Sequence, residues 1–451
     1  MTPLASLRIP SALWTSIRDD VLSTPHLERA AVGFAGIVQN GSSRQLLIRD
    51  WAAVPSDEYQ VQLAHHLEVS PVFWARAAKR ARVTGEGLVV IHSHPQESDR
   101  PRFSPSDDGG EDRLVPKIQA RASVPVAAIV VSPAGERARC TEPAGRRVET
   151  TLQIVGEPTG RRQSAIDSRV HHRQILALGQ EGHSLIAGMR VGIVGAGGLG
   201  AHVIQQFVHL GVGEIVVVDP DRVDASNLSR LVGASRLDAR LHRRKTRVAR
   251  RIVRRVGAST TVTEVPQSVT CKSGAVPLLS CDVVIGCTDN HWSRTVLNAI
   301  AFQYYVPVLD LGVELQAEGA VGGRVTWLAP GSACLWCLGI LDPERVRVEQ
   351  LPRTILQEEQ TRGYIQGFDV PAPAVVSING VVASLAVTEV LARWTGFAGP
   401  APRAALLLYR IADGVVRRAS PSPRPGCPTC SSAGLLGAGD LDKLPWRVGR
   451  N

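Results

Sequence analysis

The 451-residue sequence is poor in cysteine, in lysine and in long apolar runs. Eight cysteines are too few for a disulfide-stabilised scaffold. Only five of the 51 basic residues are lysine, and the formal net charge of +10 permits an acidic partner without requiring one. No apolar run of signal-peptide length opens the chain. The most apolar stretch, residues 375–394, contains Asn379 and Glu389, so it predicts a buried helix rather than a membrane span.

The composition, 44% hydrophobic and 20% charged, is that of an ordinary globular protein, and the length suggests roughly two or three domains. Residues 1–155 mix predicted strands and helices. Residues 156–168 form a polar linker, residues 169–432 alternate strands and helices, and residues 433–451 form a Gly-rich tail that we expect to be flexible. The alternation predicts a mostly parallel, doubly wound α/β sheet. We expect a cytoplasmic protein with neither a membrane nor a nucleic-acid partner.

The string HSHP at residues 92–95 ends a predicted strand and suggests a metal site. Residues i and i+2 of a strand point to the same face, so His92 and His94 could hold one metal ion together. Asp107 as a third ligand would leave a position for water, the arrangement of catalytic zinc. Ser104, which precedes a proline, is suited to cap a helix beside Asp107.

The pattern H-x-H-P followed by S-x-x-D resembles the JAMM motif of the MPN-type metalloproteases. That family also has an upstream glutamate at the edge of an apolar segment, a place that Glu28 occupies here. The resemblance implies a JAMM/cytidine-deaminase-like α/β domain with zinc on His92, His94 and Asp107. It further implies that Glu28 transfers protons and that Ser104 stabilises an oxyanion during cleavage at the C-terminus of a ubiquitin-like protein.

A second motif, G-x-G-x-x-G at Gly195, Gly197 and Gly200, follows a predicted strand and opens a predicted helix. Such glycines, together with Gly198 between them, let the backbone approach phosphates at the helix N-terminus. Asp219 ends the next strand at the spacing of a ribose contact. The motif alone also fits an NAD-dependent enzyme.

The residues that follow resemble the ThiF/MoeB adenylating enzymes, which include the ubiquitin-activating enzymes. The segment VVVDPDRVDASNLSR and the later CTDN carry the resemblance, which implies a Rossmann-like doubly wound domain that binds ATP and Mg²⁺. It assigns Asn227, Arg230 and Lys245 to phosphate contacts and Asp289 to the magnesium. It also implies a homodimer in which Arg173 reaches the partner's phosphates.

Two CxxC pairs predict a structural zinc site closed by four thiolates. The four ligands are Cys334, Cys337, Cys427 and Cys430. The remaining cysteines are Cys140, Cys271, Cys281 and Cys287. None of these lies beyond Asp289, where ubiquitin-activating enzymes usually place a thioester cysteine, so we expect activation to stop at the adenylate.

Arginine dominates residues 236–255. The run predicts either a solvated helix with a buried stripe at Leu241, Val248 and Ile252, or a docking face for an acidic carrier protein or for nucleotide phosphates.

Together these features predict a bifunctional enzyme with one catalytic zinc, one structural zinc, ATP and Mg²⁺. We expect it to process and adenylate a ubiquitin-like protein with a C-terminal glycine in a bacterial conjugation pathway, with a conjugating enzyme as a further partner. One alternative is activation and processing of a sulfur carrier in cofactor or cysteine biosynthesis. Another is a non-catalytic scaffold of a conjugation complex. Arg230, Asp289 and the CxxC pairs argue against an NAD oxidoreductase.

Overall fold

The computed structural model describes residues 4–40, 43–141, 145–157, 168–256, 259–315, 321–362, 365 and 373–446. The chain forms two compact units. Unit 1 contains Met1–Val155, Gln303–Tyr305 and Ser431–Lys443, and unit 2 contains Gly156–Phe302, Val306–Cys430 and Leu444–Asn451. Of the predicted linker, residues 158–167 lie outside the described residues.

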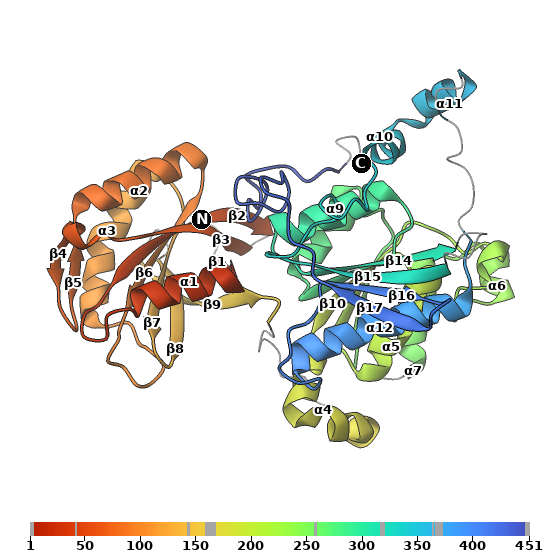
Figure 1. Cartoon of the computed structure of the whole chain (residues 1–451), viewed down its shortest axis with the longest axis horizontal. Helices are drawn as coiled ribbons and strands as arrows, with labels where there is room; N and C mark the ends of the chain where they lie inside the picture. The colour runs from red at the N-terminus through yellow and green to blue at the C-terminus, as the bar shows by residue number, and fades with distance from the viewer. Residues whose placement is uncertain are drawn as a thin grey trace. The chain divides into compact units, whose positions relative to one another are not determined.

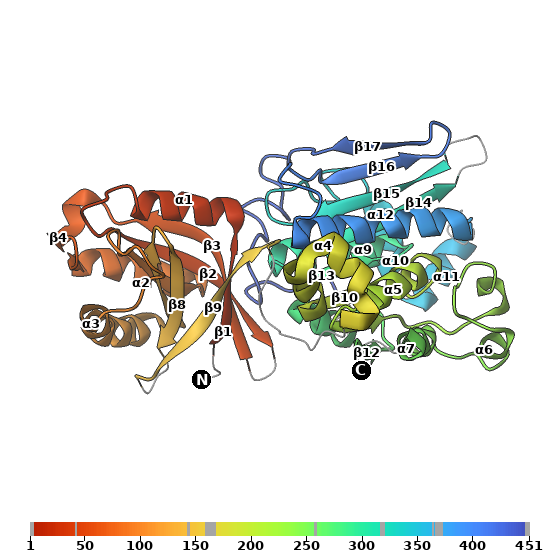
Figure 2. The same cartoon turned by 90° about the horizontal axis from the view of Figure 1, so that it is seen from below.

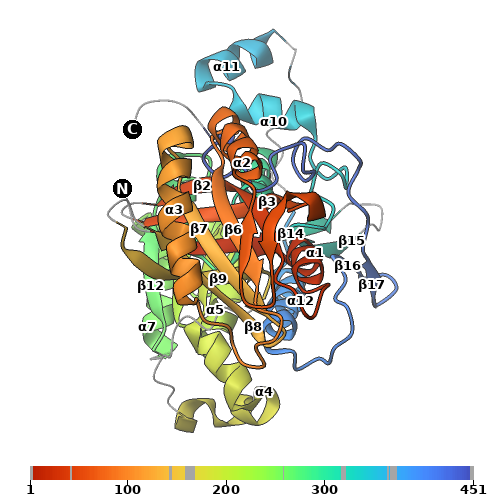
Figure 3. The same cartoon turned by 90° about the vertical axis from the view of Figure 1, so that its left-hand side faces the viewer.

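Seven strands of unit 1 close into a barrel in the order β1-β3-β2-β6-β7-β8-β9, because β1 pairs in parallel with β9. Alternate residues of its strands enter two different apolar clusters. Ala31 and Ala35 pack in the cluster that contains α1, whereas Val32 and Phe34 pack in the cluster that contains α2 and α3. Helix α1 and the pair α2 and α3 therefore cover opposite sides of the strands (Figure 3).

The helices and strands of unit 1 have the following bounds: β1 Leu4–Pro10, α1 Ser11–Val21, β2 Ala30–Asn40, β3 Ser43–Ala53, β4 Tyr59–Gln62, β5 Leu67–Val69, α2 Pro71–Thr84, β6 Gly87–Ser93, α3 Pro105–Ala122, β7 Val126–Ser132, β8 Gly135–Thr141 and β9 Arg147–Val155. β4 and β5 form a separate antiparallel pair. A short 3-10 helix, Ser56–Glu58, precedes β4.

The segment Ser431–Lys443 packs within unit 1, so the expectation of a flexible tail is wrong for residues 433–443. Asp440 donates its backbone N–H to the carbonyl oxygen of Ile37 (2.7 Å) and accepts a hydrogen bond from the Tyr304 hydroxyl (2.9 Å). The side chain of Gln303 donates to the carbonyl oxygen of Gly439 (2.8 Å). These hydrogen bonds to residues far away in the sequence hold the segment in place, although its Gly-rich composition predicted a flexible tail.

Unit 2 is built on an eight-stranded sheet in the order β12-β11-β10-β13-β14-β15-β16-β17. The pairs from β12 to β14 are parallel, whereas β14 to β17 pair antiparallel. The predicted parallel sheet is thus confirmed for its first five strands and continues as an antiparallel extension. Helices α5, α7 and α12 cover one face and α9 covers the other (Figure 1).

The helices and strands of unit 2 have the following bounds: α4 Ser168–Gly188, β10 Arg190–Val194, α5 Gly198–Leu210, β11 Glu214–Val218, α6 Arg236–Arg240, α7 Lys245–Val256, β12 Thr261–Val265, α8 Lys272–Ala275, β13 Val283–Gly286, α9 His291–Gln303, β14 Val308–Leu315, β15 Val321–Leu328, α10 Pro343–Gln350, α11 Arg353–Thr361, α12 Val376–Thr395, β16 Leu406–Arg410 and β17 Val415–Ala419. Two 3-10 helices span Ala225–Asn227 and Val276–Ser280.

Among the described residues, α12 is the one helix long and apolar enough to span a membrane. Its Val382, Ala386 and Val390 belong to the core cluster of unit 2, and the helix lies along the sheet beside α4 and α5 (Figure 2). The predicted burial is confirmed for the side of the helix that packs on the sheet, whereas Val376 and Val381 are exposed.

The arginine-rich run 236–255 is divided between α6 and α7. Val248 is buried and Ile252 packs against the core, but Leu241 is exposed because it follows the end of α6, so the predicted buried stripe is wrong at that position.

Candidate functional sites

The first site lies in unit 1, where β6 ends and α3 begins. His92 lies in β6, and His94 continues the strand by donating its backbone N–H to the carbonyl oxygen of Val131 (2.8 Å). Ser104 caps α3: its hydroxyl accepts the N–H of Asp107, whose carboxylate in turn accepts the N–H of Ser104. This capping box fixes Asp107 in the first turn, directly opposite the two histidines.

The three side chains converge as the sequence predicted. Asp107 Oδ1 lies 3.1 Å from His92 Nε2, and Asp107 Oδ2 lies 3.4 Å from His94 Nε2. The ligand atoms of all three residues lie within 4.8 Å of one another. His92 Nε2 is buried and has the Asp107 carboxylate as its one ion-pair neighbour among the described residues, so it is available as a ligand. Two imidazoles and a carboxylate around one point fit a zinc ion.

Glu97 also belongs to this site, although the sequence analysis did not identify it. Its carboxylate lies 2.8 Å from His94 Nδ1, which leaves Nε2 directed toward Asp107. A carboxylate on the outer nitrogen of a metal-binding histidine fixes the orientation of the ring and raises its basicity. The available signal was an acidic residue three positions after the second histidine.

Glu28 lies just before β2, and its carboxylate is buried 3.8 Å from His94 Nε2. The end of β4 and the residue after it hold its backbone: the Glu28 N–H donates to the carbonyl oxygen of Leu63 (2.9 Å), and the side-chain amide of Gln62 donates to the Glu28 carbonyl (3.0 Å). Burial raises the pKa of Glu28 to about 7, although the neighbouring histidines oppose the shift. A carboxyl that titrates near neutral pH beside a metal site suits proton transfer.

The second site is the Gly-rich turn between β10 and α5 in unit 2. Gly195 has a φ of +91°, and a Cβ on Gly200 would lie 1.8 Å from the Gly195 carbonyl oxygen. The turn therefore requires glycine at both positions. Gly197 is the N-cap of α5 and provides no side-chain cap, so the first N–H groups of the helix remain available to a phosphate.

Asp219 follows β11 and is buried against this turn. Its Oδ2 accepts the N–H of Ala196 (2.6 Å), and its Oδ1 accepts the N–H of Asp221 (2.7 Å). Burial raises the pKa of Asp219, and the nearby Lys245 ammonium opposes that effect. Each carboxylate oxygen of Asp219 can accept a second hydrogen bond, so Asp219 could bind a ribose hydroxyl while it keeps the two backbone hydrogen bonds.

Of the residues predicted to contact phosphates, Arg230 lies against this turn. The side chain of Arg230 packs over Gly198, where an added Cβ would lie 3.4 Å from Arg230 Cγ, and its guanidinium donates to the Ser226 carbonyl oxygen (2.9 Å). Lys245 Nζ lies 2.8 Å from Asp221 Oδ2. Asn227 has a structural role, because its side chain accepts the N–H of Asp224 (3.2 Å) in a capping box.

Asp289 is exposed in the loop after β13. Since β11 and β13 flank β10, this loop and the Gly-rich turn lie at the carboxyl ends of neighbouring strands, where ligands bind in open α/β sheets. Arg173 lies on a different element: it is exposed on α4, before the kink at Gly179. Its predicted role in a homodimer stays a prediction.

Two further buried polar groups lie at the carboxyl ends of these strands, and their sequence context did not mark them as site residues. Asn379 of α12 points at the Gly-rich turn, because a Cβ on Gly198 would lie 2.5 Å from Asn379 Nδ2. Asp310 of β14 is fully buried, 2.8 Å from Arg324 NH2 and 3.4 Å from Arg294 Nε. Arg294 also donates to the carbonyl oxygen of Thr288 (3.0 Å), the residue before Asp289.

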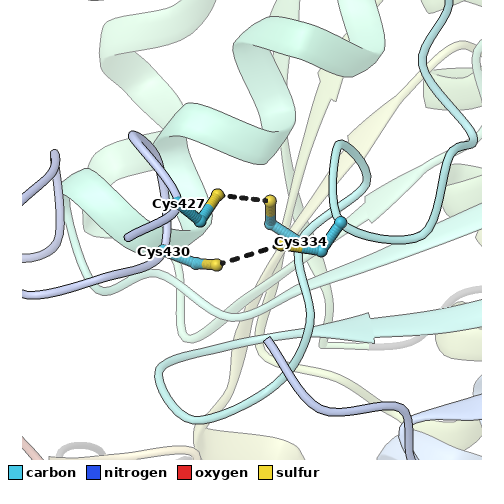
Figure 4. Close-up of side chains that lie close together, drawn as sticks. Cys334, Cys427 and Cys430 are labelled. Atoms are coloured by element: carbon cyan, nitrogen blue, oxygen red, sulfur yellow. Dashed lines mark hydrogen bonds between the residues drawn. The ribbon is translucent and has the colours of Figure 1, made fainter. Parts of the chain in front are cut away.

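The third site brings together the two CxxC pairs, which lie far apart in the sequence (Figure 4). Cys334 and Cys427 have their sulfurs 3.7 Å apart, and Cys337 and Cys430 have theirs 3.6 Å apart. Four thiolates at about 2.3 Å from a tetrahedral zinc would be about 3.8 Å apart, whereas a disulfide measures about 2.05 Å. The Arg424 N–H donates to Cys337 Sγ, and a hydrogen bond from Cys430 lowers the pKa of Cys334 to about 5. This cluster fits a structural zinc ion.

The other four cysteines differ in their surroundings. Cys140 and Cys281 are buried. Burial raises the pKa of Cys287 above its ordinary value. Cys271 is partly exposed, and its thiol donates to the carbonyl oxygen of Ser268 (2.9 Å).

Comparison with known proteins gives a match to the ThiF family over residues 171–429. The chain is 29% identical over 278 residues to the SAMP-activating enzyme E1 of Haloferax volcanii, covering 61% of this chain and 93% of that protein. It is 28% identical over 262 residues to the molybdopterin-synthase adenylyltransferase of Escherichia coli (58% and 95% covered). It is 29% identical over 264 residues to the sulfur carrier protein adenylyltransferase of Thermus thermophilus (58% and 89%). Residues 1–155 lie outside the family match.

Proposed function

The chain belongs to the ThiF family, and on that premise we propose that it is an ATP-dependent adenylyltransferase for the C-terminal carboxylate of a small sulfur-carrier or ubiquitin-like protein. The names of similar proteins support this substrate class, since they include a sulfur carrier protein adenylyltransferase and a SAMP-activating enzyme. The observation that carries the proposal is the Gly-rich turn with Asp219, Arg230 and Lys245 beside it.

In the proposed reaction, the terminal carboxylate of the carrier attacks the α-phosphate of ATP, and pyrophosphate leaves. The N–H groups at the start of α5 hold phosphate oxygens, and Asp219 holds the ribose. Arg230 and Lys245 stabilise the negative charge that grows on the phosphoryl oxygens. Lys245 must first leave its ion pair with Asp221, which ATP phosphates would replace. Asp289 is exposed and can hold Mg²⁺.

Activation of a sulfur carrier fits the similar proteins better than removal of a ubiquitin-like modifier does. We propose that the acyl-adenylate is the final product of this chain and that an external nucleophile accepts the acyl group. A homodimer with Arg173 near the partner's nucleotide and a separate conjugating enzyme remain predictions of the same proposal.

Pyrophosphate exchange into ATP, measured with a small carrier protein that ends in glycine, tests the adenylation step. We expect Arg230→Ala to lower the exchange rate at least about 100-fold, because it removes a charge that acts on the transition state. Arg418→Ala is the matched control, since Arg418 is exposed on β17, lies outside the arginine-rich run, and its loss changes the net charge equally. Equal rates in the two variants would contradict the role of Arg230.

We further propose that unit 1 is a zinc-dependent peptidase or isopeptidase of the JAMM type that acts at the C-terminus of such a carrier. His92, His94 and Asp107 would hold the zinc ion, which supplies an activated water when bound. Glu28 would hold and release a proton beside that position, since its buried carboxylate lies 3.8 Å from His94 Nε2. Ser104 keeps Asp107 in place through the capping box and is the proposed oxyanion donor.

A further inference from the structure

A cavity of about 430 Å³ in unit 1 begins at the candidate zinc site and runs between α2, α3 and the β4–β5 pair. Glu28, His92 and Asp107 line one end. Its walls are mostly apolar and include Trp74 and Ala78 of α2, Leu67 and Val69 of β5, and Leu114 and Ile118 of α3. A cavity of this size and composition is typical of a ligand-binding site.

The other end of the cavity is basic. Arg113, Lys117 and Arg121 line it and lie four residues apart, so they share one face of α3. Arg113 lies 4.0 Å from the Glu68 carboxylate. Among the described residues, no carboxylate pairs with Lys117 or Arg121, and both are exposed.

Apart from Glu68, which pairs with Arg113, the acidic residues of the wall do not neutralise this end. Glu111 is buried, and its carboxylate is bound by Arg139 (2.9 Å). Glu28 and Asp107 belong to the candidate zinc site. The His66 ring forms a hydrogen bond with the Ser106 hydroxyl (2.9 Å), which connects the β4–β5 pair to the start of α3.

The length of the cavity follows from the helix that lines it. From Asp107 to Arg121 there are 14 residues, or about 21 Å at 1.5 Å per residue. An extended peptide advances about 3.3 Å per residue, so about six residues would cover that distance. Alternate side chains of such a peptide point in the same direction.

We propose that this cavity binds an extended peptide segment of about six residues with an apolar side chain toward Trp74 and Leu67 and acidic side chains toward Lys117 and Arg121. The proposal rests on the peptidase function proposed for unit 1, and it defines the substrate class of that site: a chain whose scissile bond lies about four to six residues from acidic residues. The unpaired basic end selects acidic side chains, and the candidate zinc site lies at the opposite end.

The test uses the full-length, zinc-loaded Glu28→Gln variant, which keeps the zinc ligands and prevents turnover. Three fluorescent eight-residue peptides share a central leucine and carry two aspartates, two serines or two lysines toward one end. Fluorescence anisotropy should show the tightest binding for the aspartate peptide. Replacing the central leucine by serine should weaken that binding at least about tenfold, because the burial of one leucine side chain has an effect of this size.

Adding Lys117→Glu and Arg121→Glu should weaken binding of the aspartate peptide about tenfold and should make the lysine peptide the better ligand. Lys79→Glu with Arg82→Glu is the matched control, because both residues are exposed on α2 and neither lines the cavity. Equal affinity for all three peptides, or an equal effect of the control pair, would overturn the proposal.

Cleavage by the wild-type chain separates this proposal from the peptidase proposal. If the aspartate peptide binds with the expected preference but is not cut, the peptidase function is wrong and the peptide site stands. If all three peptides are cut at equal rates, the peptidase function stands and the proposed specificity is wrong.

Discussion

The buried cluster of Asp310, Arg294 and Arg324 tests how much buried ion pairs contribute to the stability of unit 2. Asp310 is fully buried, whereas the two arginine side chains are 14% and 16% exposed. Asp310→Ala would leave two largely desolvated cations without their shared carboxylate. Removing one partner of a buried ion pair lowers the free energy of unfolding by about 3–5 kcal/mol. Because the two arginines are partly exposed, we expect a loss at the lower end of that range, about 3 kcal/mol.

A loss of that size should lower the Tm of unit 2 by roughly 6–12 °C, since about 1 kcal/mol shifts a domain of its size by about 2–4 °C. Differential scanning fluorimetry measures it. Asp413→Ala is the control, because Asp413 also pairs with two arginines, Arg410 and Arg417, but is 37% exposed. We expect Asp413→Ala to lower the free energy of unfolding by less than about 1 kcal/mol. Equal shifts in the two variants would refute the argument from burial.

The same cluster should affect activity. Arg294 holds the Thr288 carbonyl and so positions the loop that carries Asp289. Arg294→Lys keeps the charge but loses the planar fork of donors, so pyrophosphate exchange should need a higher Mg²⁺ concentration for half-maximal rate. An unchanged Mg²⁺ dependence would show that the cluster is structural only.

Three other predictions concern the metals, pH and the separation of the two activities. Elemental analysis should find two zinc ions per chain, and a chelator should remove the ion at His92, His94 and Asp107 first, because thiolates close the other site; a single zinc in fully active protein would contradict this. A hydrogen bond from Arg251 lowers the pKa of Asp238, so this pair should stabilise unit 2 above about pH 4 and lose its effect as the pH falls. The stability difference between wild type and Asp238→Asn, measured by urea unfolding, should therefore shrink toward pH 2, and a difference independent of pH would be inconsistent with the ion pair. Glu28→Gln should abolish cleavage of a carrier fusion while pyrophosphate exchange continues at the wild-type rate, and wild-type cleavage by this variant would exclude Glu28 as the proton carrier.

The sequence was most informative where a site depends on short, local patterns. The spacing of His92, His94 and Asp107 predicted their convergence, because a strand and a capped helix place side chains in known directions. The Gly-rich turn was predictable for the same reason. The two CxxC pairs were separated by about 90 residues, yet their thiol chemistry predicted that they meet.

Groups that depend on long-range packing were not predictable. Asn379 and Asp310 reach the carboxyl ends of the parallel strands from α12 and β14, and no short motif around either residue marks it as part of a site. The packing of Ser431–Lys443 in unit 1 depends on hydrogen bonds to residues more than 100 positions away, which leave no periodic signal. The antiparallel extension from β15 to β17 likewise depends on strand pairing rather than on composition.

The central claim is that this chain transfers AMP to the C-terminal glycine of a small carrier protein. Intact-mass spectrometry of such a carrier, after incubation with the chain, ATP and Mg²⁺, tests it most directly. We expect an adenylated carrier and no thiol-sensitive adduct between the carrier and any cysteine of the chain. A carrier that stays unmodified while the correctly folded chain binds both it and ATP would contradict the claim.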